Sequence, residues 1–569
     1  MLSIKKEIAG ILQRELPDMS VEEIEASIEI PSDSSLGDYA FPCFRLAKTL
    51  RRPPHVIAGE LAGAIGNNEL FARTEAVNAY VNMFIDGKWL ARITLNDVCA
   101  GGDDFGRSDI GGGRPVIVEF SSPNIAKPFH IGHIRTTVIG NSIHKIFDFL
   151  GYRTIRINHL GDYGTQFGKM IVAYRRWGNR ADVEAAPIST LLSYYVKFHE
   201  EVEKDPGLDD EAREIFSKLE RQEPEETALW QWFRDESLKE FARVYKMLDI
   251  EFDSFAGESF YSDKMGAVLE EMEAKGILKD SQGAKIVDLE PYGMPPALIT
   301  KRDGSSLYIT RDIAAAIYRK KTYDFYKNIY VVGAQQNLHF QQWFKILELM
   351  GYEWHDQCVH INFGTVSLAE GTLSTRKGRV VFLEDVLNKA VEQTRQVILE
   401  KNVNTDSIEE TAKMVGIGAV IFQELSNGRI KDYTFSWEKT LNFDGETGPY
   451  VQYTHARAAS VLRNGGFSVP KETGAVDLSY LTGDSAFALL KTIYRFPEAV
   501  LDAGEKYEPS IITRHIVDVA QAFNKFYHDE HILTEDAGEK EAKLLLTYAA
   551  KQTIKNGLRL LGIQSPEKM

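Results

Sequence analysis

The strongest constraint on the fold is a strand, a loop, a helix and a second strand that follow one another in the first third of the chain. Residues 115–122 (PVIVEFSS) form a short apolar run with β-branched side chains, which predicts a strand. Apolar residues at helical spacing predict a helix over 133–150, and Gly151 lies just past its expected end. Residues 154–158 (TIRIN) predict the next strand. A βαβ unit of this kind begins a doubly wound parallel sheet.

The rest of the chain extends this unit. Residues 327–333 (KNIYVVG) and 360–367 (HINFGTVS) predict two more strands. The charged stretch from 182 to about 282 has helical patterns and predicts an insertion between the two halves of the sheet. From Leu387 onward helical patterns dominate to the end of the chain.

Composition bears on partners and on compartment. The 569 residues include 66 Lys and Arg against 82 Asp and Glu, a net charge of −16. This balance argues only weakly against a nucleic-acid partner, because residues 200–226 alone, with 12 acids and 4 bases, supply half of it. The three cysteines, Cys43, Cys99 and Cys358, are too scattered for a disulfide framework or a cysteine-based zinc site. With no apolar run of about 20 residues and no signal-peptide pattern, we expect the cytoplasm and no membrane partner.

One thirteen-residue loop carries the clearest chemical signal. Residues 121–133 (SSPNIAKPFHIGH) lie between the predicted strand and helix, where a doubly wound sheet binds its ligands. The helix N-terminus favours phosphate, His130 and His133 add hydrogen-bond donors, and Gly132 lets a purine approach the backbone. The alternative is a proline-bounded connecting loop with two surface histidines.

This loop resembles the ATP-binding signature of the class I aminoacyl-tRNA synthetases, and its flanking residues resemble the arginyl family. Five more segments resemble motifs of that family in the same order: 158–168 (NHLGDYGTQFG), 307–312 (LYITRD), 332–339 (VGAQQNLH), 373–378 (LSTRKG) and 448–457 (GPYVQYTHAR). A weaker match lies at 37–40 (GDYA). Six motifs in order, over about residues 119–460, make the resemblance specific.

The resemblance implies a multidomain α/β protein with a Rossmann-type catalytic domain. We expect the following division: an N-terminal α+β domain that contacts tRNA over 1–100, a glycine-rich linker over 101–114, the catalytic domain with its insertion over 115–390, a helical connecting region over 391–449, and a helical anticodon-binding domain over 450–569. The implied reaction joins L-arginine to its cognate tRNA with ATP, through an arginyl-adenylate. The family also implies that tRNA must be present before arginine is activated, and that the chain acts as a monomer.

An arginine pocket needs a carboxylate and an aromatic face, because a guanidinium is planar and always charged. Tyr308 and Asp312 are four residues apart and share a face if their segment is helical. The resemblance implies that Asp312 pairs with the guanidinium and that Tyr308 packs against it. The alternatives are that Asp312 caps a helix and that Tyr308 is a core aromatic.

The remaining arginine contacts come from the resemblance. Asn124 and Gln336 are expected to hold the α-amino and carboxylate ends. Ser122, Pro123 and His133 lie in the same loop as Asn124 and are expected to line that part of the pocket. Glu119, at the end of the predicted strand, is a second candidate carboxylate, with an exposed strand residue as the alternative.

The expected ATP contacts fall on two loops. The resemblance implies that His130 and His133 stabilise the α-phosphate, that Gly132 lies beside the nucleotide, and that the second loop supplies Ser374, Thr375, Arg376 and Lys377. That loop departs from the class I Lys-Met-Ser-Lys pattern, since both lysine positions are lost when the loops are aligned on Ser374. Lys127 is the candidate replacement, with a solvated loop lysine as the alternative. Mg²⁺ is expected to arrive with ATP, and no structural zinc is expected.

The tRNA contacts are less specific. The helices after residue 450 are expected to read the anticodon, where unpaired bases stack on aromatic rings. The candidates are Tyr450, Tyr453, Arg457, Phe523, Phe526 and Tyr527, and core packing is the alternative for each aromatic residue. In the N-terminal domain, Lys48, Arg51 and Arg52 are candidate phosphate contacts, or ordinary surface charge.

Two other functions remain open from the sequence. One is a different class I synthetase, although the cysteinyl type needs a zinc-binding Cys and His set that this chain lacks. The other is a non-catalytic RNA-binding relative, which is expected to have lost His130, His133 or Asp312; all three are present.

Overall fold

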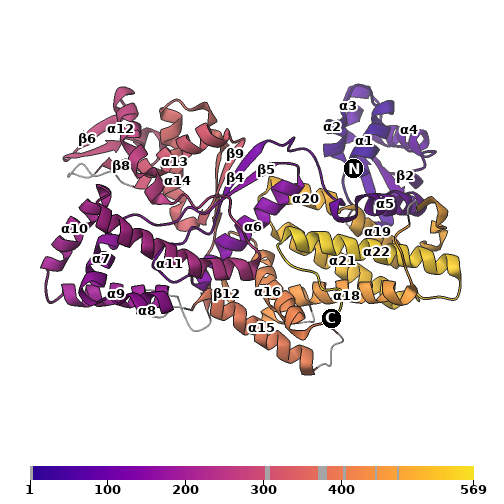
Figure 1. Cartoon of the computed structure of the whole chain (residues 1–569). Helices are drawn as coiled ribbons and strands as arrows, with labels where there is room; N and C mark the ends of the chain where they lie inside the picture. The colour runs from indigo at the N-terminus through magenta and orange to yellow at the C-terminus, as the bar shows by residue number, and fades with distance from the viewer. Residues whose placement is uncertain are drawn as a thin grey trace.

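The computed structural model describes residues 4–31, 33–300, 308–368, 381–400, 405–442, 445–470 and 473–569. A central parallel sheet separates two groups of helices, and a small N-terminal domain lies at one end of the molecule (Figure 1). Ser374, Thr375, Arg376 and Lys377, which were predicted to contact ATP, lie outside the described residues.

The N-terminal domain packs helices on a three-stranded antiparallel sheet of order β1-β3-β2. Its elements are α1 (Ile4–Glu15), α2 (Val21–Ser27), β1 (Tyr39–Pro42), α3 (Phe44–Leu50), α4 (Pro54–Ile65), β2 (Phe71–Val77), β3 (Tyr80–Ile85) and α5 (Gly87–Gly101). The alternating pattern from 77 to 85 predicts one strand, and this is wrong: β2 ends at Val77 and β3 begins at Tyr80. Asn78 makes the turn with a φ of 56°, a left-handed conformation that asparagine tolerates.

The central sheet has four parallel strands in the order β10-β9-β4-β5. Their bounds are β4 (Pro115–Glu119), β5 (Arg153–Ile157), β9 (Lys327–Gly333) and β10 (Cys358–Phe363). α6 (Ile134–Phe149) joins β4 to β5, as the sequence predicts. Because the order along the chain reverses between β4 and β9, ligands of this doubly wound sheet are expected beyond the carboxyl ends of these two strands.

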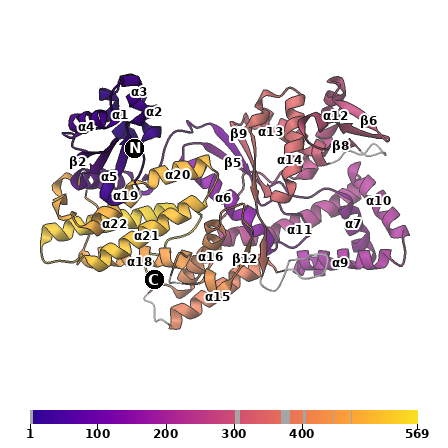
Figure 2. The ribbon, with the colours of Figure 1, turned by 180° about the vertical axis from the view of Figure 1, so that it is seen from behind.

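Helices cover both faces of this sheet (Figures 1 and 2). Val116 and Val118 of β4 belong to the core that includes α6, whereas Ile117 belongs to the core formed with α13 (Tyr308–Tyr323) and α14 (Asn337–Leu349). Alternate side chains of β4 thus serve opposite faces, as a buried parallel strand requires. The predicted multidomain α/β fold is confirmed.

The insertion is mostly helical but also contains strands. Its elements, with α7 before it, are α7 (Thr165–Trp177), α8 (Arg180–Ala185), α9 (Pro187–Val202), α10 (Gly207–Glu220), α11 (Pro224–Leu248), α12 (Met265–Ala274), β6 (Leu278–Ser281), β7 (Ala284–Val287) and β8 (Ala297–Thr300). The last three form an antiparallel sheet of order β6-β7-β8. The prediction of a helical segment up to about 282 is therefore wrong at the C-terminal end of the insertion, where β6 lies.

The second half of the chain is mainly helical, as predicted. A connecting region holds β11 (Val366–Leu368), α15 (Leu383–Glu400), α16 (Ile408–Ser426), β12 (Tyr433–Phe435) and α17 (Trp437–Thr440). The C-terminal bundle holds α18 (Gly448–Gly465), α19 (Asp484–Tyr494), α20 (Phe496–Glu505), α21 (Ser510–Asp529) and α22 (Ala537–Leu560). β11 and β12 pair in parallel and join the two parts of the connecting region.

The N-terminal domain lies against the C-terminal bundle (Figure 1). Lys491 Nζ of α19 lies 2.8 Å from Asp38 Oδ1. The rings of Phe105 and Phe496 stack with their centroids 5.8 Å apart. The segment after α5 is therefore packed against the bundle, and it positions the N-terminal domain.

The close approach of α6 to the end of β4 gives the first prediction. A Cβ placed on Gly140 would lie 2.1 Å from Phe120 Cβ, so Gly140→Ala should overpack the core and cost about 1–3 kcal/mol in the free energy of unfolding. Gly59→Ala in α4 is the control, because a Cβ there meets nothing within 4 Å and should stabilise by about 0.5–1 kcal/mol. Urea unfolding followed by circular dichroism measures both, and a Gly140→Ala midpoint at or above that of the parent would contradict the packing.

Candidate active site

The loop that follows β4 has strained backbone at its start. Ser121, Ser122 and Ala126 have φ values of 69°, 47° and 57°, the left-handed region that non-glycine residues seldom adopt. Three such residues close together cost free energy, so surrounding contacts must hold them. Such strain is typical of ligand-binding loops.

Contacts from the insertion and from α6 hold this loop. The Ser121 hydroxyl lies 2.8 Å from the Tyr245 hydroxyl of α11, and the Ala126 N–H donates to Ser237 Oγ of the same helix at 2.9 Å. The Ser121 N–H donates to Thr136 Oγ1 of α6 at 3.1 Å. The insertion, whose role the sequence does not reveal, therefore supports the loop from behind.

His130 and His133 lie together at the start of α6. A 3-10 turn over Ile131–His133 leads into the helix, and the two imidazole centroids are 4.0 Å apart. His133 Nδ1 lies 3.2 Å from the His130 backbone nitrogen, and His130 Nδ1 accepts from the Gly132 N–H at 3.0 Å. Because His130 Nδ1 accepts, the neutral His130 ring holds its proton on Nε2. His133 Nδ1 also lies 3.3 Å from the His130 carbonyl oxygen, so either tautomer of the neutral His133 ring fits these contacts.

Burial keeps both rings neutral. It lowers the pKa of His133 to about 3, with the neighbouring His130 as a smaller cause. It also lowers the pKa of His130. A neutral imidazole can donate to a phosphate oxygen without giving up a proton, so this pair suits stabilisation of charge rather than acid catalysis.

Asp312 and His339 form a direct contact between α13 and α14. Asp312 lies in the second turn of α13, and His339 lies in the first turn of α14. His339 Nε2 is 2.5 Å from Asp312 Oδ2, and both side chains are about one-quarter to one-third exposed. Asp312 therefore does not cap α13, which already begins at Tyr308. Because His339 contacts one carboxylate oxygen, Oδ1 can still accept from a ligand.

Tyr308 lies at the exposed start of α13. Its side chain is 59% exposed, which excludes a core position. The Arg311 guanidinium lies 5.4 Å from the Tyr308 ring centroid and 4.7 Å from that of Tyr163. Arg311 Nη1 lies 3.1 Å from Glu258 Oε2, and burial raises the pKa of Glu258 to about 7 even though Arg311 opposes that rise. The charge of Arg311 thus has its own carboxylate within the chain.

Glu119 also has its own cation. It is the last residue of β4 and is 6% exposed, so the alternative of an exposed strand residue is excluded. Its Oε2 lies 2.6 Å from Arg319 Nη1 on α13, and Arg319 is completely buried. Arg319 also approaches His159 Nδ1 at 3.4 Å. This pair ties β4, the residues after β5 and α13 together.

A comparison of these carboxylates separates their possible roles. Glu119 faces Arg319 and Glu258 faces Arg311. Asp162 accepts from the Ser259 N–H at 2.8 Å and faces Arg234 at 3.3 Å. Asp312 differs, because among the described residues its ion-pair partner is a histidine rather than a lysine or arginine. Among the carboxylates compared here, Asp312 is thus the one that has no arginine partner within the described residues.

The other predicted contacts lie around this edge of the sheet. Asn124 and Gln336 are both exposed, after β4 and β9 respectively, and the Pro123 carbonyl accepts from the Gly161 N–H at 3.1 Å. Ser122 Oγ accepts from the His159 N–H at 3.3 Å. Lys127 is half-buried and lines a hollow of about 600 Å³ with residues of α9.

The sequence predictions missed His339, Arg319 and Glu258. His339 ends one of the motifs that resemble the arginyl family, so the motif itself could have indicated it. Arg319 and Glu258 have no local signal, because their partners Glu119 and Arg311 lie far away in the sequence.

Some tRNA candidates gather on the surface of the bundle. The Arg457 guanidinium lies 4.8 Å from the Tyr453 ring and 5.6 Å from the Tyr527 ring, and both tyrosines are about 40% exposed. Asn524 joins them, since it accepts from Arg457 at 2.7 Å and donates to the Tyr450 hydroxyl at 2.9 Å. Together these residues form an exposed aromatic and cationic patch on α18 and α21.

The remaining tRNA candidates divide by exposure. Phe523 and Phe526 are fully buried, so they pack the core of the bundle. Lys48 and Arg51 are exposed, whereas Arg52 pairs with Glu60.

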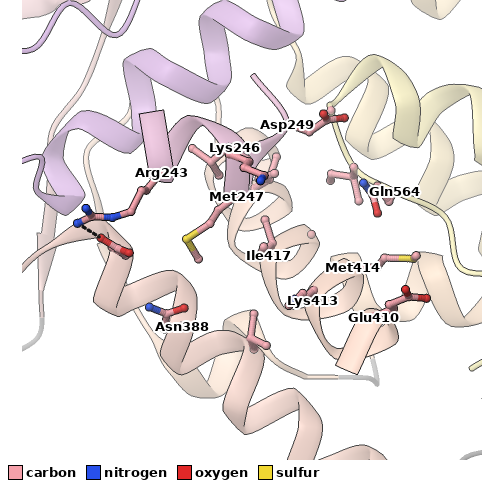
Figure 3. Close-up of a pocket in the computed structure, with 17 residues that line it drawn as sticks. Arg243, Lys246, Met247, Asp249, Asn388, Glu410, Lys413, Met414, Ile417 and Gln564 are labelled. Atoms are coloured by element: carbon pink, nitrogen blue, oxygen red, sulfur yellow. Dashed lines mark hydrogen bonds and ion pairs between the residues drawn. The ribbon is translucent and has the colours of Figure 1, made fainter. Parts of the chain in front are cut away.

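A separate cavity of about 690 Å³ lies between α11, α15, α16 and the C-terminal segment (Figure 3). Arg243 and Glu384 pair across one end at 3.4 Å, while Met247, Met414 and Ile417 give it an apolar wall. None of the predicted site residues lines this cavity.

Within the described ranges, no three His, Cys, Asp or Glu side chains gather as a metal site requires. No helix in them has the length and apolar character that a membrane crossing needs.

Comparison with known proteins gives consistent matches over the whole chain. Residues 103–437 match the family "tRNA synthetases class I (R), catalytic domain", residues 451–569 the "DALR anticodon binding domain" and residues 2–85 the "Arginyl tRNA synthetase N terminal domain". The chain is 58% identical to proteins named arginine–tRNA ligase from Halothermothrix orenii and from Clostridioides difficile, each match covering 100% of both chains. It resembles the solved Thermus thermophilus arginyl-tRNA synthetase with a TM-score of 0.82 and 26% identity, again over 100% of both chains.

The neutrality of His133 can be tested directly. With a pKa of about 3, its ring should stay uncharged from pH 8 to pH 5, whereas histidine in the unfolded chain titrates near 6.5. NMR of protein labelled at the histidine Cε1 carbons measures this, with His133→Asn to assign the signal and the urea-unfolded chain as the control. Because the unfolded chain takes up a proton that folded His133 excludes, this group should lower stability as pH falls from about 6.5 toward 3. A His133 signal that titrates near pH 6.5 would contradict this picture.

Proposed function

Since this chain belongs to the family of arginyl-tRNA synthetases, we propose a role in its reaction for each group at the carboxyl edge of the sheet. The chain joins L-arginine to its cognate tRNA in two steps. The arginine carboxylate attacks the α-phosphate of ATP and pyrophosphate leaves; the terminal hydroxyl of the tRNA then attacks the arginyl-adenylate and AMP leaves. This membership excludes a different class I synthetase and a non-catalytic relative.

Asp312 is the guanidinium partner in this proposal. The supporting observation is the distribution of charge: Glu119 and Glu258 already face arginines of the chain, whereas Asp312 contacts His339. A substrate guanidinium would therefore find at Asp312 a carboxylate that no arginine of the described residues pairs with. Tyr308, four residues earlier on the same helix and widely exposed, supplies an aromatic face for the ligand.

The polar ends of arginine go to the loops after β4 and β9. Asn124 and Gln336 are exposed there and carry amide groups that can pair with the α-amino and carboxylate groups. Ser122, Pro123 and His133 line the same loop. Glu119 remains a second candidate oxygen ligand for arginine, with its charge already balanced by Arg319.

ATP lies against the start of α6 in this proposal. His130 and His133 donate through a ring N–H to the α-phosphate oxygens as charge builds up in the transition state, and Gly132 leaves room for the nucleotide. Mg²⁺ would arrive with ATP and would help to neutralise the charge of its phosphates. Ser374, Thr375, Arg376 and Lys377 contribute from the second loop, a role that rests on sequence alone.

tRNA contacts two distant surfaces. The patch of Tyr453, Arg457 and Tyr527 offers stacking and cationic contacts for anticodon bases, with Tyr450 held beside it. Lys48 and Arg51 are exposed phosphate contacts in the N-terminal domain. We also propose the domain division predicted from the sequence, activation of arginine only with tRNA bound, and a monomer that works in the cytoplasm. The three unpaired cysteines suit that compartment.

The role of Asp312 can be tested by Asp312→Asn. Loss of a charged hydrogen-bond partner costs about 1.5–3 kcal/mol, so the KM for arginine should rise roughly 10- to 150-fold while the KM for ATP changes little. Asp324→Asn, immediately after the same helix and with a side chain 90% exposed, is the matched control and should behave as the parent enzyme. Steady-state aminoacylation measures both. An unchanged KM for arginine in the folded Asp312→Asn enzyme would remove Asp312 from the pocket.

The role of Lys127 is tested by Lys127→Ala. If Lys127 supplies charge toward the phosphates, this substitution should lower the rate of adenylate formation about tenfold or more and leave arginine binding nearly unchanged. Single-turnover adenylate formation and equilibrium arginine binding give the two readouts. Lys506→Ala, which changes an exposed lysine immediately after α20, is the control. Equal adenylation rates for Lys127→Ala and the parent would show that Lys127 does not act on the phosphates.

A further inference from the structure

Arg135 is a buried cation that the proposed reaction does not use. It lies in the first turn of α6, two residues after His133, and is 1% exposed. Its Nη1 donates to the Gly364 carbonyl at 3.0 Å and to the Lys431 carbonyl at 2.7 Å. Its guanidinium carbon lies 5.2 Å from the centroid of the Tyr433 ring. One side chain of α6 therefore contacts segments that lie more than 200 residues away in sequence.

These partners lie at the interface between the parallel sheet and the connecting region, which we call the seam. Gly364 follows β10, while Lys431 lies between α16 and β12. Two other bonds close the same seam without involving α6. Arg429 Nη1 donates to the Asn362 carbonyl at 2.7 Å, and the Thr365 N–H donates to Asp432 Oδ1 at 2.5 Å.

Glu424 of α16 completes the arrangement around Arg135. Its side chain is fully buried, and its Oε2 lies 3.8 Å from Arg135 Nε, which is too long for a hydrogen bond. Tyr433 donates to the other carboxylate oxygen, and burial raises the pKa of Glu424 to about 7. Within the described residues, Arg135 Nε and Glu424 Oε2 have no hydrogen-bond partner.

Such an ion pair is a poor source of stability. Removing two charges from water is costly, and well-packed apolar side chains of similar size are often as stable or more so. The arginine instead fixes the position of the helix that carries it, because its planar guanidinium donates to several carbonyls at once. The fixed helix turn is the one that begins with His133.

We propose that Arg135 is a positioning residue for adenylate formation, which holds the first turn of α6, and with it the His130 and His133 pair, against α16 and the β11–β12 sheet. The inference depends on the proposed role of the histidines in ATP binding. It also links the helical half of the molecule to the histidine loop, because α16 accepts a hydrogen bond from Gln452 of α18 at its Met414 carbonyl, at 3.0 Å.

Arg135→Lys tests this proposal. Lysine keeps the charge but lacks the planar fork, so it cannot make the same set of carbonyl contacts. Because a misplacement of about 1 Å can cost roughly 100-fold in rate, kcat for arginine-dependent ATP–pyrophosphate exchange should fall about tenfold or more, while the KM values for arginine and ATP stay within about threefold. Exchange is measured with saturating tRNA at 25 °C, on protein that circular dichroism shows to be folded.

Arg429→Lys is the matched control. It weakens the same seam, but the hydrogen bonds and ion pair of the Arg429 side chain within the described residues go to Asn362 and Glu508 rather than to α6, so kcat should stay at the level of the parent enzyme. A fall in kcat equal to that of Arg135→Lys would overturn the proposal, because general weakening of the seam would then explain both. A folded Arg135→Lys enzyme with the kcat of the parent would also overturn it.

Glu424→Gln decides the question if Arg135→Lys does not fold. It should lower kcat in the same direction, with unchanged KM values, and a parent-like kcat would overturn the proposal.

The two proposals fail in different ways. If Asp312→Asn leaves the KM for arginine unchanged, the proposed pocket is wrong. If only kcat of the Arg135 and Glu424 variants stays unchanged, the pocket stands and the positioning role is lost.

Discussion

The ion pair between Glu119 and Arg319 fixes the geometry on which the active site depends. Glu119 ends the central strand β4, Arg319 lies on α13, and both are buried at the carboxyl edge of the sheet. Asp312 lies two helical turns before Arg319 on the same face, about 10 Å along the axis. Fixing Arg319 therefore fixes the position of Asp312, which we propose as the partner of the substrate guanidinium. Arg319 also balances the charge of Glu119, whereas Asp312 pairs with a histidine.

The histidine pair depends on segments that are remote in the sequence. From one side, Tyr245 and Ser237 of α11 hold the strained residues after β4. From the other, Arg135 connects the first turn of α6 to the connecting region. The insertion and the helical half thus support the loop that we propose for ATP binding. A site built mainly for charge stabilisation requires this kind of support, because its donors must be fixed before charge develops.

Local patterns predicted most of the elements and proposed the candidate site residues, and long-range pairing explains what they missed. The βαβ unit, the helix after His133 and the helical second half follow from periodicity, and Tyr308 and Asp312 do lie one turn apart on a helix. The hairpin at Asn78 was missed because residues 71–77 (FARTEAV) do not alternate between apolar and polar side chains, so only the second strand has a local signal. The pairs of Glu119 with Arg319 and of Arg135 with Glu424 join residues 200 or more positions apart. No spacing rule reaches that far, so these contacts, and the roles they imply, needed the structure.

We propose that this edge of the sheet activates arginine, and only arginine, once tRNA is bound. ATP–pyrophosphate exchange with each of the amino acids, with and without total tRNA, tests this activity most directly. We expect exchange with arginine alone, and only when tRNA is present. Exchange with another amino acid would contradict the assignment of Asp312 and Tyr308 to the side-chain pocket. Exchange with arginine in the absence of tRNA would keep the pocket and contradict the dependence on tRNA.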